Sequence, residues 1–451
     1  MPVWKNGWAF WQRVPIPARL ILGLCLLVLC GSVFFLLPGT TTRPLLLHEA
    51  LFTAVSALTV TGLSLITPSR ELTLSGQIGL MFLIQIGGVG FMVAAVMVLR
   101  LLGRSVTLLD RLTLRDSLGL IAPGAILQAV RQLLVLVFAF ELAGALMLWL
   151  YWLPRLGLGR GLLYALFHAV SAFCNAGFNL FDGLPEFPHG IPNDPVSLAI
   201  LGGLMFVGGL GLPVLLELLH GNALHRISLH TRITLILTFS LFWVGALAFW
   251  GVESFAGGAL HGFPPEQQIA IAAFQSISAR TAGFSAVASF ETFTPATQFL
   301  LIVLMFIGCA PASMGGGITT GTLAALGLGV WAYARGLVQP QIAGRTLGIH
   351  TIRRAAAVLS ISLFLVSLAT WLILATHPHA TLDAALFEVV SAFATCGLSL
   401  AFTSQLNGFG LAVIMLMMFW GRLGALTVVL AFLQNRRASQ LTYPEEQILL
   451  G

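Results

Sequence analysis

The sequence predicts an all-α integral membrane protein made of four similar units around one axis, and two observations support this fold class. The 451 residues are 58% hydrophobic and 8% charged, with a mean hydropathy of +0.96, whereas a soluble domain carries about a quarter charged residues. One short segment also occurs four times, 106 to 115 residues apart. A period of that length corresponds to a whole structural unit and not to a solenoid repeat.

The repeated segment has a fixed pattern of side chains. A Phe precedes a Ser by four residues, an Ala follows the Ser, and a Gly closes the segment. The copies occupy residues 51–63, 166–178, 273–284 and 386–398. The helix before each Gly is too short to span a bilayer, which takes about 20 residues, so each copy is a candidate re-entrant helix and loop.

Each copy lies between two longer apolar stretches, which we predict to be spanning helices. In the first unit they cover residues 19–37 and 74–102, with a short helix at 48–58 and a loop at 59–63 between them. The GGVG motif at 87–90 would let neighbouring helices approach closely. The later units give long helices at 121–152 and 197–219, at 232–250 and 297–333, and at 355–375 and 409–433. Eight spanning helices and four re-entrant loops result.

These units divide the chain into consecutive segments. We predict an N-terminal interfacial segment at 1–15, repeat 1 at 16–104, repeat 2 at 105–225, repeat 3 at 226–345 with a broken second helix, repeat 4 at 346–435 and a C-terminal tail at 436–451. The first 15 residues lack the long apolar core and cleavage site of a signal peptide. Their three Trp beside Lys5 and Arg13 suit a membrane interface.

The basic residues fix an orientation for these spans. With the N-terminus inside, sixteen Lys and Arg fall in inner segments and only four, Arg43, Arg70, Arg155 and Arg160, in outer ones. This is the positive-inside bias of membrane proteins. Ten acidic residues fall outside, which gives the outer face a net charge of −6. They form either a negative vestibule that concentrates cations or ordinary solvated loops.

Composition also argues against several other classes. The basic residues lie scattered beside apolar spans with no basic stripe, so no nucleic-acid partner is expected. The five cysteines show no CxxC spacing and no adjacent His cluster, which argues against a disulfide framework or a metal site. A membrane-embedded enzyme needs clustered reactive side chains, and only Glu141 and Arg422 are clearly charged within the spans.

The repeated segment suggests how such a protein could hold a cation. A helix directed into the membrane carries about half a negative charge at its C-terminal end. The chain then turns through V-T-G-L, N-A-G-F, T-A-G-F or T-C-G-L, and the Gly allows carbonyls to turn toward a common axis. Rings of carbonyls replace the hydration shell in potassium filters. The alternative is that these glycines merely cap ordinary helices.

At these residues the chain resembles the Ktr/Trk/HKT superfamily of potassium transporters, whose membrane subunits contain four M1-P-M2 units around a central pore with pseudo-fourfold symmetry. The resemblance covers essentially the whole chain, and it implies that backbone carbonyls alone hold K⁺. The implied selectivity-filter residues are Val60, Thr61, Gly62, Leu63, Asn175, Ala176, Gly177, Phe178, Thr281, Ala282, Gly283, Phe284, Thr395, Cys396, Gly397 and Leu398. A Gly in all four units goes with potassium selectivity in this superfamily.

The second long segment of the third unit contains Pro311 and three consecutive glycines. In a helix interior Gly costs about 1 kcal/mol and Pro about 3 kcal/mol, so the segment must break within the membrane. The superfamily has a gating loop at this position. The resemblance therefore implies a gate formed by Pro311, Ala312, Ser313, Gly315, Gly316, Gly317, Thr319, Thr320 and Arg422. A kink used only for packing is the alternative, and Thr319 and Thr320 either face the ion or cap the restarted helix.

Three charged residues lie at membrane depth. Arg422 lies inside an apolar span, and the family places an Arg there as a cationic barrier and as an anchor for loop carbonyls; a snorkelling Arg is the alternative. Arg280 precedes the third filter strand and either pairs with an outer carboxylate or depresses conduction. Glu141 is expected to pair with a local donor, such as a backbone or Arg group.

The resemblance implies a gated subunit for potassium uptake of Ktr type in the bacterial cytoplasmic (inner) membrane, with a cytoplasmic N-terminus and with Na⁺ as an activator. Implied partners are membrane lipids, a second copy of the chain contacted through residues 443–451, and a cytoplasmic ring of RCK (KTN) domains that binds ATP or ADP. This chain itself is expected to hold no cofactor. The alternatives are a Trk-type subunit or a repeat-built coupled cation symporter, for which inverted repeats are expected.

Overall fold

The computed structural model describes residues 16–90, 126–220, 227–337 and 339–424, apart from residues 185, 186, 188, 189, 256, 257, 288, 289 and 343. The predicted N-terminal segment at 1–15 and the tail at 436–451 lie outside these residues. Within the described part the chain is helical except for loops and one two-stranded antiparallel hairpin, β1 (Gln341–Ile342) and β2 (Arg345–Thr346).

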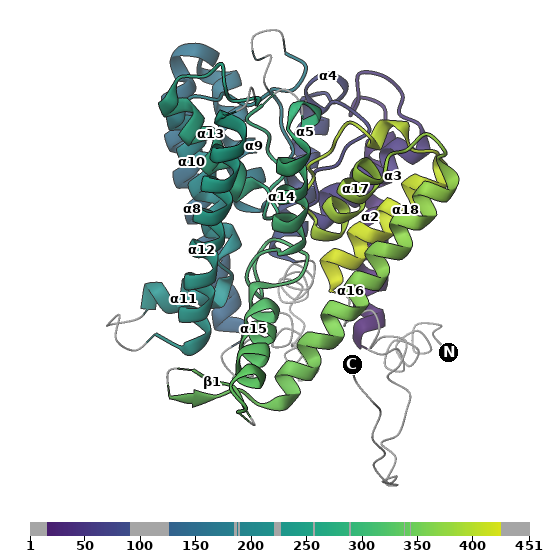
Figure 1. Ribbon diagram of the computed structural model, residues 1–451. Helices are drawn as coiled ribbons and strands as arrows, with labels where there is room; N and C mark the ends of the chain where they lie inside the picture. The colour runs from purple at the N-terminus through teal and green to yellow at the C-terminus, as the bar shows by residue number, and fades with distance from the viewer. Residues whose placement is uncertain are drawn as a thin grey trace, which may run out of the picture.

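The helices follow one plan four times, with a helix, a shorter buried helix and another helix in each unit (Figure 1). The first two units comprise α2 (Ile16–Leu36), α3 (Leu47–Thr59), α4 (Pro68–Glu71), α5 (Leu74–Val89), α8 (Ile126–Leu156), α9 (Leu158–Phe173), α10 (Pro195–Gly209) and α11 (Leu212–His220). The last two comprise α12 (Leu229–Ser254), α13 (Pro265–Ser278), α14 (Pro295–Phe306), α15 (Thr320–Ala334), α16 (Ile349–Thr376), α17 (Leu382–Ala394) and α18 (Gly408–Leu423).

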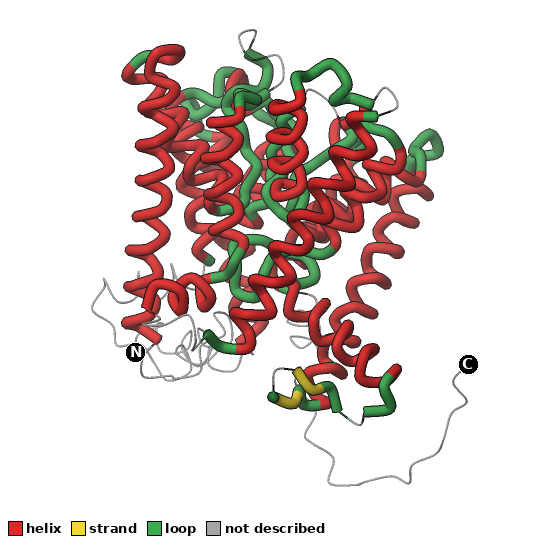
Figure 2. Tube along the Cα trace, turned by 60° about the vertical axis from the view of Figure 1, so that its left-hand side comes forward, coloured by secondary structure: helices red, strands yellow, loops and turns green. Residues whose placement is uncertain are grey.

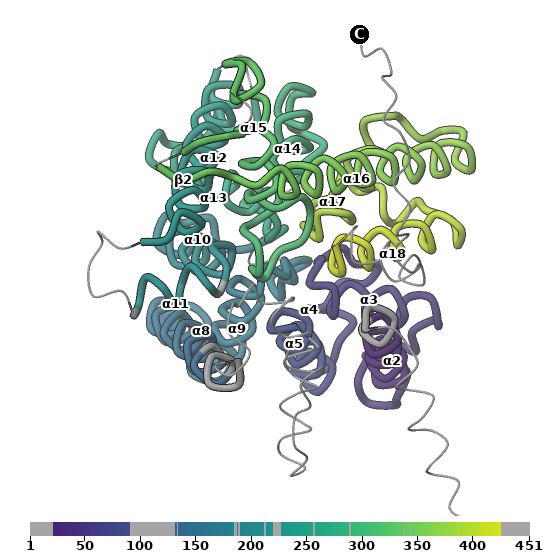
Figure 3. The backbone as a smooth tube through the Cα atoms, turned by 90° about the horizontal axis from the view of Figure 1, so that it is seen from below, coloured from purple at the N-terminus to yellow at the C-terminus, as the bar shows by residue number. Residues whose placement is uncertain are grey.

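The units follow one another around the molecule. In Figure 3 the colour passes from purple α2 through α8, α12 and α16 to yellow α18, which returns beside α3. The last helix of each unit packs on the short helix of the next: α5 on α9, α10 on α13, α14 on α17 and α18 on α3. The first unit therefore contacts the fourth, and the four units close into a ring.

Glycines make this packing close. A Cβ added to Gly87, Gly208 or Gly421 would collide with the backbone carbonyl of Leu58, Phe173 or Phe393, near the C-terminal end of a short helix. The shared Phe side chains of the repeat fill the space behind these helices. Phe52, Phe167, Phe274 and Phe387 are all fully buried.

Three helices are long and apolar enough to cross a bilayer: residues Leu134–Leu156, Leu229–Ser254 and Ile349–Thr376. A fourth span is obtained if α10 and α11, which meet at a 104° bend, count as one. Most of the remaining apolar helices of the described residues are 10–17 residues long. The chain is thus a mostly helical membrane protein, and the number of eight spans stays a prediction.

Three second helices are interrupted where the sequence predicts them to continue. The helix predicted at 197–219 bends at Gly211, which has φ +85°. Helices α5 and α18 end at Gly90 and Gly424, with φ +91° and +81°, in place of running on toward residues 102 and 433. A Gly adopts such angles at little cost. Each glycine therefore ends or bends its helix, and the segments directly after Gly90 and Gly424 lie outside the described residues.

Candidate functional site

Each short helix ends in a turn of the same handedness. The residue directly after α3 or α17, and the second residue after α9, has a left-handed backbone, with φ +58° at Val60, +50° at Thr395 and +56° at Asn175. In the third unit Thr281 has φ +154°, after an additional residue, Arg280. The repeat glycines follow with positive φ in all four units: +90° at Gly62, +69° at Gly177, +71° at Gly283 and +93° at Gly397. These turns lead the chain away from each helix end.

The four glycines lie against one another in a closed ring. A Cβ built on Gly62 would lie 3.3 Å from the Cα of Gly177, and the corresponding distance is 3.2 Å from Gly177 to Gly283. The same distance is 3.2 Å from Gly283 to Gly397 and 3.0 Å from Gly397 to Gly62. Each such Cβ would also collide with a carbonyl oxygen of the next strand, that of Ala176, Ala282, Cys396 or Thr61. The structure thus brings the four predicted filter strands together on one axis.

The repeated Ser ties each strand to its helix. The Oγ atoms of Ser56 and Ser391 accept hydrogen bonds of 3.0 Å from the N–H groups of Gly62 and Gly397. In the other two units the Ser hydroxyl donates to the carbonyl after the Gly, from Ser171 to Phe178 (2.9 Å) and from Ser278 to Phe284 (2.6 Å). The sequence marked this Ser by its repetition but did not reveal its partner.

The residue after each repeat Phe is polar and fully buried, a feature that sequence reasoning missed. These residues are Thr53, His168, Gln275 and Glu388. In two units they hold the chain just beyond the Gly: His168 Nε2 lies 2.9 Å from Asn179 Oδ1, and Glu388 accepts from Ser399 at 2.7 Å and from Thr403. The signal was an aligned polar residue on an otherwise apolar helix face.

Several acids of the predicted outer face are neither solvated nor arranged as a vestibule. Glu253 and Glu388 have no exposed surface. Glu253 accepts hydrogen bonds from Ala259 and Thr294. Glu49 pairs with Arg43, with an N–O distance of 2.8 Å, at the start of α3. These carboxylates fasten loops to helix ends.

A loop interrupts the second helix of the third unit, as predicted. Helix α14 ends at Phe306 and α15 begins at Thr320. Ile307 and Ile318 form an isolated parallel bridge, and the Thr320 N–H donates to the Cys309 carbonyl at 3.1 Å. Ala312 and Gly317 within the loop have φ +57° and +76°. Figure 2 shows non-helical chain running through the middle of the molecule among the helices.

This loop lies against the filter strands of two units. The Gly316 N–H donates to Thr395 Oγ1 at 2.9 Å, and a Cβ on Gly315 would lie 2.7 Å from the Cβ of Thr281. Thr281 and Thr395 are the first residues of strands three and four. The loop therefore adjoins the filter on the side of the helix ends.

The loop also contacts the end of α10 in the second unit. The N–H groups of Ala310 and Met314 donate to the carbonyls of Gly209 (3.1 Å) and Gly208 (3.3 Å). The Thr319 hydroxyl accepts from the Thr322 N–H at 3.4 Å, so Thr319 caps α15. The Thr320 hydroxyl is buried and has no hydrogen-bond partner among the described residues.

Arg422 reaches both the loop and the first unit. Its Nη1 donates to the Met314 carbonyl at 2.5 Å, and its Nη2 donates to the carbonyls of Gly88, at 3.0 Å, and Gly87. The guanidinium ends on backbone carbonyls inside the protein, which is not the geometry of a snorkelling side chain. Arg422 and the hydrogen bonds described above therefore connect the loop to units one, two and four.

The two other membrane-depth charges have hydrogen-bond partners that the sequence did not specify. Arg280 is 5% exposed and makes no ion pair within the described part of the chain; its Nη2 donates to the Gly308 carbonyl at 3.0 Å. Of the two alternatives for Arg280, the pairing with an outer carboxylate is not found among the described residues. Glu141 is 2% exposed and accepts from the Cys174 thiol, with an S–O distance of 3.6 Å, in place of a backbone or Arg donor.

The sequence matches a known family and several named proteins. Residues 35–440 match the family model described as TrkH: Cation transport protein. The chain is 34% identical to Ktr system potassium uptake protein B of Bacillus subtilis, over 100% of both chains. It is 31% identical to potassium/sodium uptake protein NtpJ of Enterococcus hirae, over 96% of this chain and 97% of that one.

Its fold is also similar to a solved structure. The crystal structure of the potassium transporter TrkH from Vibrio parahaemolyticus superposes with a TM-score of 0.72 and 21% sequence identity, and the match covers 91% of this chain and 83% of that chain. This similarity extends to the fold alone. The family match is independent of it and spans most of the sequence. The chain therefore belongs to the TrkH family of cation transport proteins, which are transporters and not enzymes.

Proposed function

We propose that this chain is the pore-forming subunit of a Ktr-type system for potassium uptake, with eight spans in four M1-P-M2 units around a central pore. The observation that carries this proposal is the closed ring of Gly62, Gly177, Gly283 and Gly397. Four helix C-termini lie behind that ring, and each contributes about half a negative charge. A cation on the ring axis is stabilised by these charges.

The chemistry of the proposed filter rests on backbone oxygens. The ring positions are glycines, so no side chain obstructs the axis there. Carbonyl oxygens of the filter strands replace the water around K⁺. The strands differ in sequence between units, and we infer fewer well-formed ion sites than in a channel with four identical strands. The ion is the cargo of this site and not a resident cofactor.

The loop between α14 and α15 is the proposed gate. It adjoins the filter and contacts all four units either directly or through Arg422. In this arrangement the loop closes the path, and Arg422 both anchors it and adds positive charge beneath the filter. Release of the loop from Arg422 and Thr395 opens the path.

The proposed setting follows the names of the relatives. A full-length relative is a Ktr system protein, and another is named for potassium and sodium uptake. These similarities support a multi-pass protein of a bacterial membrane that works with partner subunits. We further propose a cytoplasmic membrane with the N-terminus inside, association of two copies, and regulation by a cytoplasmic RCK (KTN) ring that binds ATP or ADP. The similarities also make Na⁺ a candidate activator.

Potassium uptake in cells that lack their own uptake systems tests the function. Cells that express this chain together with a ring partner should accumulate K⁺ or Rb⁺ from low external concentrations, and cells with the chain alone should accumulate less. Addition of Na⁺ should raise the rate. Equal uptake with and without the chain, at confirmed membrane expression, would overturn the proposal.

A further inference from the structure

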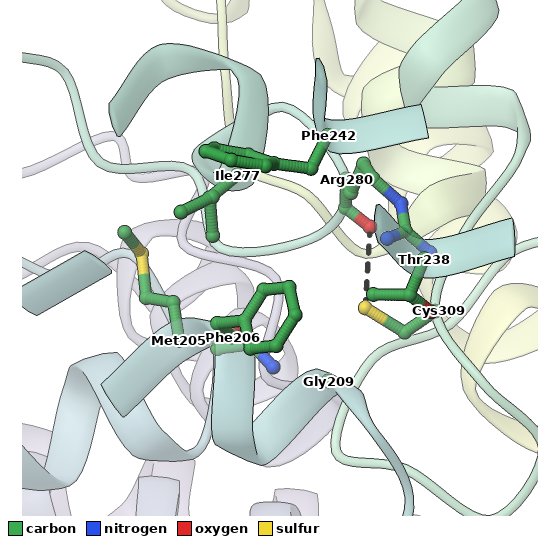
Figure 4. A pocket seen from close by; sticks show the side chains of 9 residues that line it. Met205, Phe206, Gly209, Thr238, Phe242, Ile277, Arg280 and Cys309 are labelled. Atoms are coloured by element: carbon green, nitrogen blue, oxygen red, sulfur yellow. Dashed lines mark hydrogen bonds between the residues drawn. The ribbon is translucent and has the colours of Figure 1, made fainter. Parts of the chain in front are cut away.

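A small cavity lies between the second and third units, beside the proposed gate. Four elements contribute polar groups to its wall: Asn175 begins the second filter strand, Thr238 lies on α12, Arg280 follows α13, and Cys309 belongs to the gating loop. In Figure 4 Arg280, Thr238 and Cys309 lie close together, with Phe206 and Met205 farther along the wall.

Three hydrogen-bond donors on this wall have no hydrogen-bond partner among the described residues. Asn175 Nδ2, Thr238 Oγ1 and Arg280 Nε are buried, and none has a hydrogen bond within the described part of the chain. Asn175 and Thr238 are each 2% exposed and Arg280 is 5% exposed. An unsatisfied buried polar group costs about 1–3 kcal/mol, and more when it is charged. Three such groups around one cavity indicate a missing acceptor.

The charge of Arg280 is also uncompensated. Its guanidinium donates to one neutral carbonyl, that of Gly308, and no carboxylate pairs with it among the described residues. A buried charge normally requires an opposite charge as well as hydrogen bonds. Cys309 does not meet this need, because its thiol is engaged with the Arg280 carbonyl and the Thr281 hydroxyl.

We infer that this cavity binds a single halide ion, chloride in the cell, held by Arg280, Asn175 and Thr238. The ligand must be an acceptor because the three unpartnered groups can all donate, and it must be negative because Arg280 is positive. The cavity is small, so a monatomic anion suits it better than phosphate or a carboxylate does.

The halide would connect parts that belong to different functions. Asn175 belongs to the second filter strand and Cys309 to the gating loop, while Arg280 precedes the third filter strand and donates to Gly308 of that loop. A bound anion would join these parts and would neutralise the positive charge of Arg280 beside the proposed ion path. The binding itself does not depend on the proposed transport function and can be measured without flux.

The test uses the full chain purified in detergent at constant potassium and ionic strength. Replacing gluconate by chloride or bromide should raise the melting temperature of the wild type, because a ligand that binds only the folded state stabilises it. Crystals grown in bromide should show an anomalous scattering peak within hydrogen-bonding distance of Arg280 Nε and Thr238 Oγ1.

Variants separate this site from general salt effects. Arg280→Gln should abolish the halide-dependent shift, and Thr238→Val should weaken the apparent affinity several-fold. Thr234→Val is the matched control, because Thr234 is 1% exposed on the same helix but does not line the cavity, and it should keep the full shift. If Arg280→Gln does not fold, the halide-dependent shift of Thr238→Val and the bromide peak decide whether the cavity binds a halide. A melting temperature indifferent to halide, with a neutral water in the cavity, would overturn the inference.

Discussion

The glycine ring and the loop beneath it are built on opposite principles. In the ring each unit contributes the same kind of turn, and a Cβ built on any of the four glycines would lie 3.0 to 3.3 Å from the Cα of the next glycine. In the loop a single unit supplies the chain, and the other units contribute unlike contacts: a Thr hydroxyl, two helix-end carbonyls and an Arg. In the proposed function, ion selection therefore rests on the repeated turns of the ring, whereas gating rests on a loop that only the third unit has.

This contrast predicts how the two layers respond to change. A substitution in the ring affects a shared axis and so alters selectivity whichever unit carries it. A substitution at the loop affects one contact and so alters the balance between open and closed states. Substitutions in each layer test that distinction, in order of decreasing expected effect.

Gly62→Ser should have the largest effect, with a loss of potassium over sodium selectivity of about tenfold, or about 1.4 kcal/mol. The new Cβ would lie 2.5 Å from the Ala176 carbonyl, and the residue would keep an unfavourable φ of +90°. Rubidium and sodium flux into liposomes would measure it. Gly39→Ser is the matched control, since Gly39 has φ +92° but no neighbour within 4 Å. Unchanged selectivity in Gly62→Ser would contradict the filter assignment.

Arg422→Gln should raise potassium flux by up to about tenfold, because hydrogen bonds from a charged donor to the loop and to α5 are weakened, each worth about 1.5–3 kcal/mol. Arg422→Lys separates two explanations, since Lys keeps the charge but loses the planar fork of donors. We expect flux to rise in both variants, and this result would mean that Arg422 acts by holding the loop in place through its hydrogen bonds. Wild-type flux in Lys alone would indicate a barrier of charge, and no change in either would remove Arg422 from the gate.

Thr395→Val should raise flux by a factor of about five, because the loss of one neutral hydrogen bond to the Gly316 N–H is worth about 1 kcal/mol. Selectivity should stay the same. The strand should tolerate Val, because the first unit has Val60 at this position with nearly the same φ, +58° against +50°. A change in selectivity without a change in flux would mean that this position belongs to the ring layer.

Asp182→Asn should have the smallest effect, less than twofold on uptake. Partial removal from water raises the pKa of the Asp182 carboxyl to about 6, and Asn179 opposes this shift through a hydrogen bond. The carboxyl is therefore ionised above pH 6 and neutral below it. Wild-type uptake should fall slightly from pH 7 to pH 5 as the outer loop loses this charge. The variant should lack that component, and an identical pH profile in both proteins would contradict it.

The glycine ring could be predicted from the sequence, but the loop between α14 and α15 only in part. Short apolar helices that end in Gly are local signals, and so is a Pro with three glycines inside a long apolar segment. The positions where Gly90, Gly211 and Gly424 end or bend their helices were missed. Glycines that end a helix and glycines that let two helices pack closely occur in motifs of the same composition. The sequence alone therefore does not distinguish them.

The partners of individual side chains depended on tertiary structure. Arg280 lies next to Gly308 only because the loop folds back against α13, and no sequence spacing specifies that path. His168 and Glu388 were visible as polar residues on apolar helices, but their partners Asn179 and Ser399 lie beyond the turn. The repeated Ser was evident from the sequence because it is part of the repeat. Its two modes of hydrogen bonding could be seen only in the structure.

The bridge between Ile307 and Ile318 limits how the loop can move. Because this bridge joins the two ends of the loop, the ends stay together while the residues between them can rearrange. In the proposed gate, opening then requires neither a hinge in α14 nor a tilt of α15, only the reorientation of peptide planes around Ala312 and Gly317.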